Sequence, residues 1–406
     1  MEKLIKIKRA LISVSDKTGI VELAKELYGR KIELVSTGGS ASILRNAGFK
    51  VTEVSKLTGF PEMMDGRLKT LHPNVHGGLL ADRDEKSHVN AMEKYNVKEI
   101  DLLVVNLYPF AETVRAGADY AQCIENIDIG GPAMIRAAAK NFKYVATLVD
   151  IEDYEGLVNE LKMNNGCTSY SFRQKLSQNA FSLSAYYDAM VSNWMLDNIT
   201  GVKPRRFSIS AALSQDLRYG ENPHQSASFF LDEYLQGGIG ASNQIQGKKL
   251  SYNNINDTDA ALELVNEFPQ NDGAAAVIVK HANPCGVGVA NSLVEAYRSA
   301  FSCDKTSAFG GIVALNCIID EESAREIIKV FTEVVIAPDI TEGARKIFSS
   351  KSNLRLLITK KSPVQACSSK VIKHIAGGYL LQDKDIGSLS QNNLRVVTER
   401  TPTANE

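Results

Sequence analysis

Four short apolar runs in the first 150 residues, each separated from the next by longer segments, constrain the fold most. They are "RALISVS" at 9–15, "KIELVS" at 31–36, "IDLLVVN" at 100–106 and "YVATLVD" at 144–150. Between them, 16–30 and 131–142 place apolar residues three and four apart, which is typical of amphipathic helices. Apolar strands that alternate with helices indicate a parallel sheet covered on both faces. The sequence therefore predicts a doubly wound α/β domain.

A second set of apolar runs follows later in the chain, at 274–280, 310–316, 334–339 and 354–359. Helical spacing over 257–268 precedes the first of these runs, and helical spacing over 323–334 follows the second, so we expect a second α/β domain. Before this set, the stretch "TGVKPRRFSIS" breaks the periodicity with glycine, proline and a basic cluster. A length of 406 residues also exceeds one ordinary core. We predict domains at 1–200, with a core of about 1–150, and at 206–406.

The composition limits the partners and the compartment. Hydrophobic residues make up 44% and charged residues 23%, as in ordinary globular proteins, and the net charge is −1. This balance creates no field that would draw the chain to nucleic acid or to a membrane, so neither partner is expected. The six cysteines include no Cys-x-x-Cys pair, and the first residues contain no long apolar run. We expect a cytoplasmic protein with reduced thiols and no structural zinc.

Two polar loops follow the first two strands, "SVSDKTG" at Ser13–Gly19 and "STGGS" at Ser36–Ser40. In an open parallel sheet the turns after the strands meet at the carboxyl edge, where ligands bind. Glycines let the backbone approach a ligand, hydroxyls donate hydrogen bonds, and the next helix N-terminus favours an anion. One such turn often only reverses the chain. Two on adjacent strands, with Lys17 in one of them, favour a phosphate site.

A basic loop, "MMDGRLKTLHPNVHGG" at Met63–Gly78, contains Arg67, Lys69, His72 and His76. It is either a solvated loop whose histidines cap backbone groups, or a cationic loop that binds substrate. The His-x3-His spacing would suit zinc on a helix, but Pro73 argues against a helix there. We favour the substrate loop.

Three more polar residues flank the ends of the predicted strands. Tyr108 follows the third strand in "NLYPF", Asp128 precedes a Gly-Gly turn, and Lys140 lies in the helix that follows. Taken singly, Asp128 is more often a helix cap than a catalyst, and Lys140 would be a surface lysine. Because they converge with Lys69 on strand ends that already favour a phosphate, we predict that all four act on a substrate.

The stretch "VIVKHANPCG" at Val277–Gly286 ends an apolar strand with Lys280 and His281 side by side. Side chains alternate along a strand, so the two can share a site only if the strand ends there. We expect Asn283-Pro284 to force that turn. Histidine can take or give a proton near neutral pH, and a nearby cation favours its neutral base form. The alternative is a structural His-Lys pair, which would need a polar or anionic partner.

Polar loops in the second domain are weaker candidates. They are "LRYGENPHQ" with Arg218 and Tyr219, "QGKKLSYNNINDTDAA" with Asn256, and "CDKTSAFGGIVALN" with Gly310. The stretch "PCGVGVAN" lacks the second cysteine and the His-x-Glu of a zinc deaminase, and it lacks the third glycine of a dinucleotide fingerprint. Neither of those two readings survives.

Nearly the whole chain resembles the family of bifunctional purine-biosynthesis proteins that combine AICAR transformylase and IMP cyclohydrolase. The motifs that carry this resemblance are "TGFPEMMDGRLKTLHPNVHGG", "NLYPF", "ENIDIGGP", "RYGENPHQ", "VKHANPCG" and "TSAFGGI". The resemblance implies a cyclohydrolase in the first domain, with a fold similar to methylglyoxal synthase. It implies a transformylase in the second domain, with a cytidine-deaminase-like α/β fold without zinc.

For the first domain, the resemblance implies closure of the FAICAR ring to give IMP and water without a metal. The matching catalytic residues are Lys69, Tyr108, Asp128 and Lys140. We assign the proton transfers at the carboxamide to Asp128 and Lys140, and the formyl oxygen to Tyr108 and Lys69. The residues expected to bind the substrate are Ser13, Lys17, Thr18, Ser36, Thr37, Gly38, Gly39 and Arg67.

For the second domain, the resemblance implies formyl transfer from 10-formyltetrahydrofolate, a co-substrate, to the amine of AICAR. The lone pair of this amine is delocalised into the ring, so the amine needs a base, which suits His281. Lys280 can stabilise charge on the formyl oxygen or the leaving nitrogen. The residues expected to hold AICAR are Arg218, Tyr219, Asn256 and Gly310. A homodimer is expected, because transformylase sites in the family lie at the dimer interface.

Two further expectations follow. Methylglyoxal-synthase-like domains also serve as regulatory modules, so the alternative function is a non-enzymatic sensor of nucleotide phosphate. A sensor needs the phosphate loops but not the four catalytic residues, which favour the enzyme. The sequence ends on a capping box at Thr403–Glu406, which normally begins a helix, and family motifs of a folate-facing region are missing. We expect a truncated transformylase domain beside a complete cyclohydrolase domain.

Overall fold

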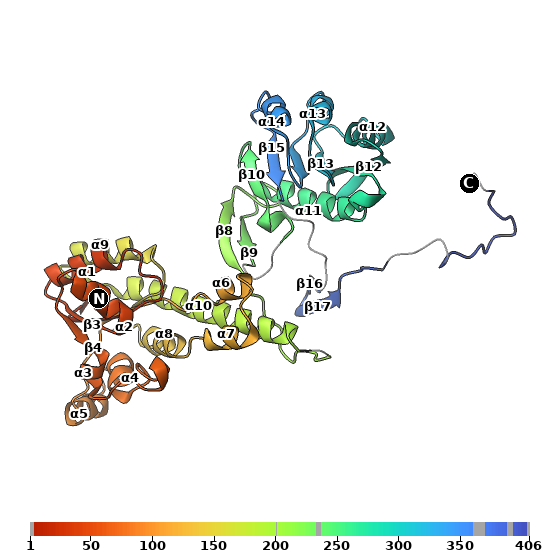
Figure 1. Ribbon diagram of the computed structural model, residues 1–406. Helices are drawn as coiled ribbons and strands as arrows, with labels where there is room; N and C mark the ends of the chain where they lie inside the picture. Colours follow the sequence, from red (N-terminus) through yellow and green to blue (C-terminus); the bar gives the residue numbers. More distant parts are fainter. Residues whose placement is uncertain (1–3, 200, 233–236, 360–369, 388–392, 404–406) are drawn as a thin grey trace. The chain divides into compact units, whose positions relative to one another are not determined.

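The computed structural model describes residues 4–199, 201–232, 237–359, 370–387 and 393–403 (Figure 1). The chain divides into two compact units, Met1–Ala212 and Leu213–Glu406, a division shortly after the predicted boundary at 200–206. Within these described ranges, no helix has both the length and the hydrophobicity that crossing a bilayer requires. The predicted capping box at Thr403–Glu406 extends outside the described residues.

A five-stranded parallel sheet forms the centre of the first unit (Figure 1). Its order is β4-β3-β2-β5-β6, with bounds β2 (Arg9–Ser13), β3 (Glu33–Ser36), β4 (Val51–Glu53), β5 (Leu102–Val105) and β6 (Ala146–Leu148). All the pairings within it are parallel. The sheet confirms the four predicted strands. It adds β4 at one edge, whose 3 residues are too few to show a strand period in the sequence.

Helices cover both faces of this sheet, which confirms the doubly wound prediction. Against one face, α1 packs its buried Ile20 and Leu23 with α9 and part of α2. Against the other face, α4, α8 and α10 pack in a separate apolar cluster that contains Leu11 and Leu103. The bounds are α1 (Ile20–Gly29), α2 (Gly38–Asn46), α3 (Val54–Thr58), α4 (Pro73–Leu80), α5 (Lys86–Lys94), α6 (Phe110–Arg115), α7 (Tyr120–Glu125), α8 (Gly130–Lys140), α9 (Asp153–Met163) and α10 (Tyr170–Asp197).

A six-stranded mixed sheet forms the centre of the second unit and confirms an α/β fold there. Its order is β10-β15-β14-β13-β11-β12, with bounds β10 (Asn243–Gln246), β11 (Ala274–Lys280), β12 (Asn283–Ala290), β13 (Ile312–Leu315), β14 (Val334–Ala337) and β15 (Arg355–Ile358). The pairs β13–β14 and β14–β15 are parallel, and the other pairs are antiparallel. Its helices are α11 (Tyr252–Asn266), α12 (Leu293–Cys303), α13 (Glu321–Ile327) and α14 (Glu342–Phe348).

Three short pairs complete the described strands, and the first and the third of them are antiparallel. They are β1 (Ile5–Lys6) with β7 (Cys167–Thr168), β8 (Ala212–Leu217) with β9 (Ala227–Leu231), and β16 (Lys370–Ile375) with β17 (Gly378–Asp383). Neither face of the β16–β17 pair is buried by the described residues.

The structure corrects the prediction that Pro73 prevents a helix. Helix α4 begins at this proline, and His72 is its N-cap, with Nδ1 accepting a hydrogen bond from the backbone N–H of Asn74 at 3.1 Å. The N–H groups of a first helical turn have no intrahelical acceptor, so proline loses nothing there. The prediction treated Pro73 as an interior residue, where it would break a helix.

The structure also corrects the position of the turn after Lys280. Strand β11 is followed by a two-residue turn of His281 and Ala282, and β12 starts at Asn283, which pairs with Lys280. Pro284, expected in the turn, lies within β12 instead. Because β12 is an edge strand, it tolerates a residue without an N–H group.

Candidate active site

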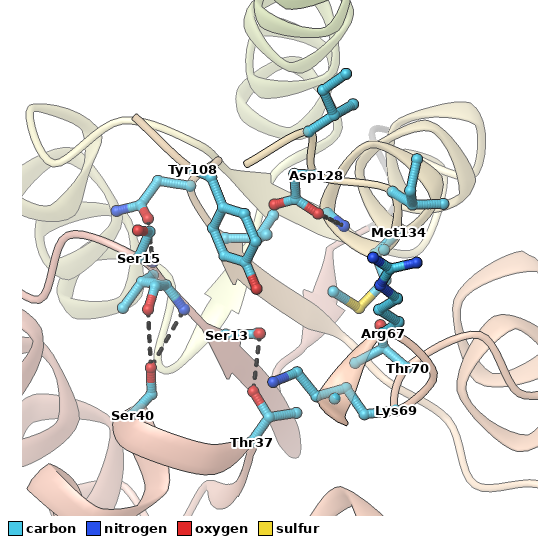
Figure 2. Close-up of a pocket in the computed structure, with 18 of the residues that line it drawn as sticks. Ser13, Ser15, Thr37, Ser40, Arg67, Lys69, Thr70, Tyr108, Asp128 and Met134 are labelled. Atoms are coloured by element: carbon cyan, nitrogen blue, oxygen red, sulfur yellow. Dashed lines mark hydrogen bonds between the residues drawn. The ribbon is translucent and has the colours of Figure 1, made fainter. Parts of the chain in front are cut away.

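A cavity of about 710 Å³ opens at the carboxyl edge of the parallel sheet in the first unit (Figure 2). The segments that follow β2, β3 and β5 line it, together with the loop before α4 and the start of α8. Expected substrate or catalytic residues in its lining are Ser13, Lys17, Thr37, Gly39, Arg67, Lys69, Tyr108 and Asp128. The strand ends meet there because neighbouring parallel strands end at the same edge.

One side of the cavity is formed by the loop after β2 and the loop between β3 and α2, which carry several hydroxyl and N–H groups. The hydroxyls of Ser13 and Thr37 lie 2.9 Å apart, which joins the loop after β2 to the start of α2. The Lys17 ammonium donates to the Ser15 carbonyl at 2.8 Å. A Cβ atom added at Gly39 would lie 3.4 Å from Cε of Lys17, so α2 and this lysine are in close proximity. Hydroxyls, a helix N-terminus and a cation together suit a phosphate group.

Three residues expected in the phosphate loops do not line this cavity. The Ser36 hydroxyl is buried and donates to the Ile12 carbonyl at 2.6 Å, and the Thr18 hydroxyl donates to Asp16 Oδ1 at 2.7 Å. Gly38 lies with Ser36 on a neighbouring cavity of about 410 Å³. The φ of +39° at Gly38 is one that other residues rarely adopt, so this glycine shapes the turn into α2.

Asp128 lies opposite these loops, at the start of α8. Its Oδ1 accepts a hydrogen bond from the backbone N–H of Gly131 at 2.8 Å, so the carboxylate caps the helix and also faces the cavity. Burial raises the pKa of Asp128, while hydrogen bonds from the backbone of Gly131 and Tyr108 and the charge of Lys69 act in the opposite direction. A carboxylate with a raised pKa beside a cation is suited to proton transfer.

Tyr108, Lys69 and Arg67 provide the donors around this carboxylate. Figure 2 shows the Tyr108 hydroxyl and the Lys69 ammonium pointing into the space that Asp128 faces. Lys69 Nζ also lies 3.4 Å from a carboxylate oxygen of Glu62. At the rim, the exposed Arg67 guanidinium pairs with Glu125, with Nε donating to Oε1 at 3.2 Å. The cavity therefore combines an acid–base group with donors for a developing negative charge.

Lys280 and His281 lie at the tip of β11 in the second unit. The Lys280 ammonium donates to the Phe309 carbonyl at 2.9 Å, next to Gly310, and the exposed His281 begins the turn. Asn256 lies on α11 beside Asp257, whose carboxylate accepts hydrogen bonds from the turn. Elements distant in sequence therefore bring four of the expected transformylase residues to one end of β11.

Arg218 and Tyr219 follow β8 and contact each other, with Cζ of Arg218 5.7 Å from the centre of the Tyr219 ring. Their expected role in holding AICAR stays a prediction.

Two family models match the chain. The model described as the AICARFT/IMPCHase bienzyme matches residues 138–406, and the model described as an MGS-like domain matches residues 19–133. The chain belongs to the AICARFT/IMPCHase bienzyme family.

Relatives of this bienzyme chain are similar along its whole length. The chain is 58% identical over 406 residues to a bifunctional purine biosynthesis protein PurH of Dinoroseobacter shibae, covering 100% of this chain and 77% of the relative. It is 57% identical over 403 residues to the PurH of Ruegeria pomeroyi, covering 99% and 76%. Among solved structures, the crystal structure of ForH is 34% identical and covers 47% of this chain and 99% of ForH, with a TM-score of 0.41.

One expected catalytic residue of the bienzyme is not brought to the cavity. Lys140 is exposed at the last position of α8, whereas Asp128 lies just before the first position of the same helix. A helix of 11 residues separates its ends by about 15 Å, so the two side chains lie at opposite edges of the sheet. Lys140 is therefore not among the residues that line this cavity, and its catalytic role stays a prediction.

The two histidines of the basic loop also lie outside the cavity lining. His72 caps α4, which agrees with the predicted alternative that the histidines cap backbone groups. His76 is partly buried, and this burial lowers its pKa. Across the described ranges, no group of three or more His, Cys, Asp or Glu residues has a geometry that could hold a metal ion. The cationic part of this loop at the cavity is therefore Arg67 and Lys69.

The structure adds residues that the sequence reasoning missed. Asn106 Oδ1 accepts hydrogen bonds from the backbone N–H groups of Ser15 and Asp16, at 2.5 and 3.1 Å, and so shapes the loop that follows β2. The Tyr187 hydroxyl of α10 accepts a hydrogen bond from the backbone N–H of Asp128 at 2.8 Å. Asn106 lies within the quoted "NLYPF" motif, so that motif could have identified it. Tyr187 is 59 residues from Asp128, and no local pattern pointed to it.

Proposed function

We propose that this chain catalyses both reactions of its family. Formyl transfer from 10-formyltetrahydrofolate to AICAR gives FAICAR, and dehydrative ring closure of FAICAR then gives IMP. The similarity of the whole chain to relatives named bifunctional purine biosynthesis proteins supports this proposal. The observation that carries the ring-closing step is the cavity that joins Lys69, Tyr108 and Asp128 to the loops of Ser13 and Thr37.

In ring closure, the carboxamide nitrogen of FAICAR attacks the formyl carbon of the same molecule. The formyl oxygen gains two protons, balanced by one lost from the carboxamide nitrogen and one lost from the formamide nitrogen, and it leaves as water when its bond to carbon breaks. The phosphate binds at the hydroxyl and N–H groups of the two loops, near Lys17. Asp128 in its carboxylate form takes a proton from the carboxamide nitrogen. Tyr108 and Lys69 donate hydrogen bonds to the oxygen that gains negative charge. Because both reacting groups belong to one molecule, holding them in contact supplies much of the rate.

In formyl transfer, the amine of AICAR attacks the formyl carbon of the folate. His281 takes the proton that the amine loses, and Lys280 stabilises the negative charge that develops on the formyl oxygen. The formyl group forms its new bond to the AICAR nitrogen as the bond to the folate nitrogen breaks, and the folate nitrogen gains a proton in place of the one that the amine loses. The homodimer stays a prediction that rests on the family resemblance. The cytoplasmic location stays a prediction that rests on the cysteine pattern and on the first residues of the sequence.

Two assays of the wild-type chain test the proposal. One follows conversion of FAICAR to IMP by absorbance, and the other supplies AICAR with 10-formyltetrahydrofolate and measures FAICAR and IMP. We expect turnover in both. Binding of FAICAR without turnover in the first assay would contradict the cyclohydrolase and favour the nucleotide sensor. Ring closure without formyl transfer would limit the proposal to the first unit.

A methyl group at Gly131 is expected to displace Asp128 and to slow ring closure about 10²-fold, the effect of misplacing a reacting group by about 1 Å. An added Cβ would lie 2.6 Å from Asp128 Oδ2 and 2.7 Å from Leu107 Cδ2, closer than real contacts allow. The measurement is kcat for FAICAR in Gly131→Ala. Gly29→Ala is the matched control, because nothing lies within 4 Å of its added Cβ. Equal rates in the two variants would contradict the assigned position of Asp128.

A further inference from the structure

The turn that presents His281 has a backbone conformation that its residues do not favour. His281 has φ +53° and Ala282 has φ +56°. Positive φ at both central residues is the mark of a type I′ hairpin turn, in which Asn-Gly is strongly preferred. A side chain beyond Cα makes this region unfavourable, most clearly for a residue such as alanine that cannot form a local hydrogen bond. Some other contact must therefore hold this turn.

Asp257 makes that contact. Its Oδ2 accepts a hydrogen bond from the backbone N–H of His281 at 3.0 Å, and its Oδ1 accepts one from the N–H of Ala282, also at 3.0 Å. The two oxygens of one carboxylate thus bind the N–H groups of the two strained residues. A charged acceptor makes each of these hydrogen bonds stronger than a neutral one would.

The position of Asp257 is itself fixed by the fold. It lies in the second turn of α11, which begins at a capping box of Ser251 and Asn254. The same helix buries Ala261 and Val265 against the face of the sheet that contains Val277 and Val279 of β11. Helix and hairpin are therefore packed together, and the carboxylate is held where the turn needs it.

We propose that Asp257 is a positioning residue for formyl transfer, which holds the turn in the conformation that points His281 and Lys280 at the substrate. This inference rests on the proposed function of the second unit. Asp257 contacts the backbone of the turn, so its expected effect is on the placement of His281. Strained residues persist where surrounding contacts hold them, and they often mark sites of function.

A rescue experiment tests this role. Asp257→Ala is expected to lower kcat for formyl transfer about 10²-fold while ring closure in the first unit stays unchanged. Adding Ala282→Gly to this variant should recover most of the lost kcat. Glycine adopts positive φ without strain, so the turn then depends less on the hydrogen bonds to Asp257. Asp272→Ala, an exposed aspartate of the same unit, is the control and should not change formyl transfer. Loss of activity without rescue by glycine would overturn the positioning role, and so would full activity in Asp257→Ala.

A second measurement does not depend on turnover. Hydrogen exchange at the His281 and Ala282 amides should be slow in the wild-type chain, because both N–H groups are bonded to Asp257. Exchange at these two amides should become at least 10-fold faster in Asp257→Ala, while amides within β11 stay protected. Fast exchange in the wild-type chain would overturn the inference. If the wild-type chain shows no formyl transfer, the proposed function fails, and the exchange data still decide whether Asp257 holds the turn.

Discussion

Replacing Asp128 with asparagine is expected to lower kcat/KM for ring closure about 10³-fold, the size expected when a general base is removed. Asparagine keeps an oxygen that can accept the hydrogen bond from Gly131, so the start of α8 should keep its structure. It cannot take the proton from the carboxamide nitrogen. The measurement is the rate of IMP formation at saturating and at limiting FAICAR. A loss of less than about 10-fold would contradict the assignment of Asp128 as the base.

The pKa of Asp128 extends this prediction to pH dependence. Burial raises this pKa, so the wild-type carboxylate becomes protonated, and inactive as a base, at a higher pH than an ordinary aspartate. The acidic limb of kcat/KM for ring closure should therefore lie above the ordinary aspartate range. An acidic limb at or below that range would show that another group controls the reaction.

The stability of the Asp128→Asn variant separates loss of chemistry from loss of structure. Because the folded-state pKa is raised, the folded protein binds the proton of Asp128 more tightly than the unfolded chain does. The stabilising contribution of the protonated form is present below the unfolded pKa and is lost as pH rises through the folded pKa. At neutral pH the variant should thus be at least as stable as the wild type, and the difference should shrink as pH falls through this window. Urea unfolding at several pH values checks this.

Replacing His281 with alanine is expected to lower kcat for formyl transfer about 10³-fold, because no base then takes the proton from the AICAR amine. Lys280→Ala should lower it about 10²-fold through loss of one donor to the formyl oxygen. Ring closure should be unchanged in both variants, because the cavity of the first unit is lined by residues of that unit. The measurement is FAICAR formation from AICAR and 10-formyltetrahydrofolate.

The control for these two variants is His374→Ala, which removes an exposed histidine on β16 of the same unit. It should leave both reactions unchanged. Imidazole added to His281→Ala offers a further check, because an external base should restore part of the lost rate. Formyl transfer by His281→Ala at the wild-type rate would exclude His281 as the base.

Much of the fold could be predicted from local patterns. The apolar runs of β2, β3, β5 and β6 are evident in the sequence, because strands covered on both faces need continuous apolar residues. The helical spacing of α1 and α8 is evident as well, because burial of one helix face imposes a period. The wrong predictions concern prolines, whose effect on secondary structure depends on their position within an element. Pro73 breaks a helix in its interior but starts one at its first position, and Asn283-Pro284 suits a turn but here opens an edge strand.

The candidate site was predicted in part. Parallel strands bring their carboxyl ends together, so the sequence by itself determined that Ser13, Thr37 and Tyr108 would approach one another. Its position beside the predicted strand ends groups Lys140 with Asp128, but that position does not tell how far along α8 a side chain lies from the cavity. Nor did the sequence reveal Asn106, which holds the loop after β2, or Tyr187, which accepts a hydrogen bond from the backbone N–H of Asp128.

The sequence by itself therefore determined the strands, the helices and the edge of the sheet at which chemistry is expected, because these follow from local periodicity and from the direction of parallel strands. Only the tertiary structure decided which flanking side chains face the cavity and which contacts position them. The hydrogen bonds from the turn of His281 to Asp257 are the clearest case, since they join residues 24 and 25 positions apart and leave no periodic trace in the sequence. Such contacts depend on how a helix packs against a sheet, and packing is set by the whole fold.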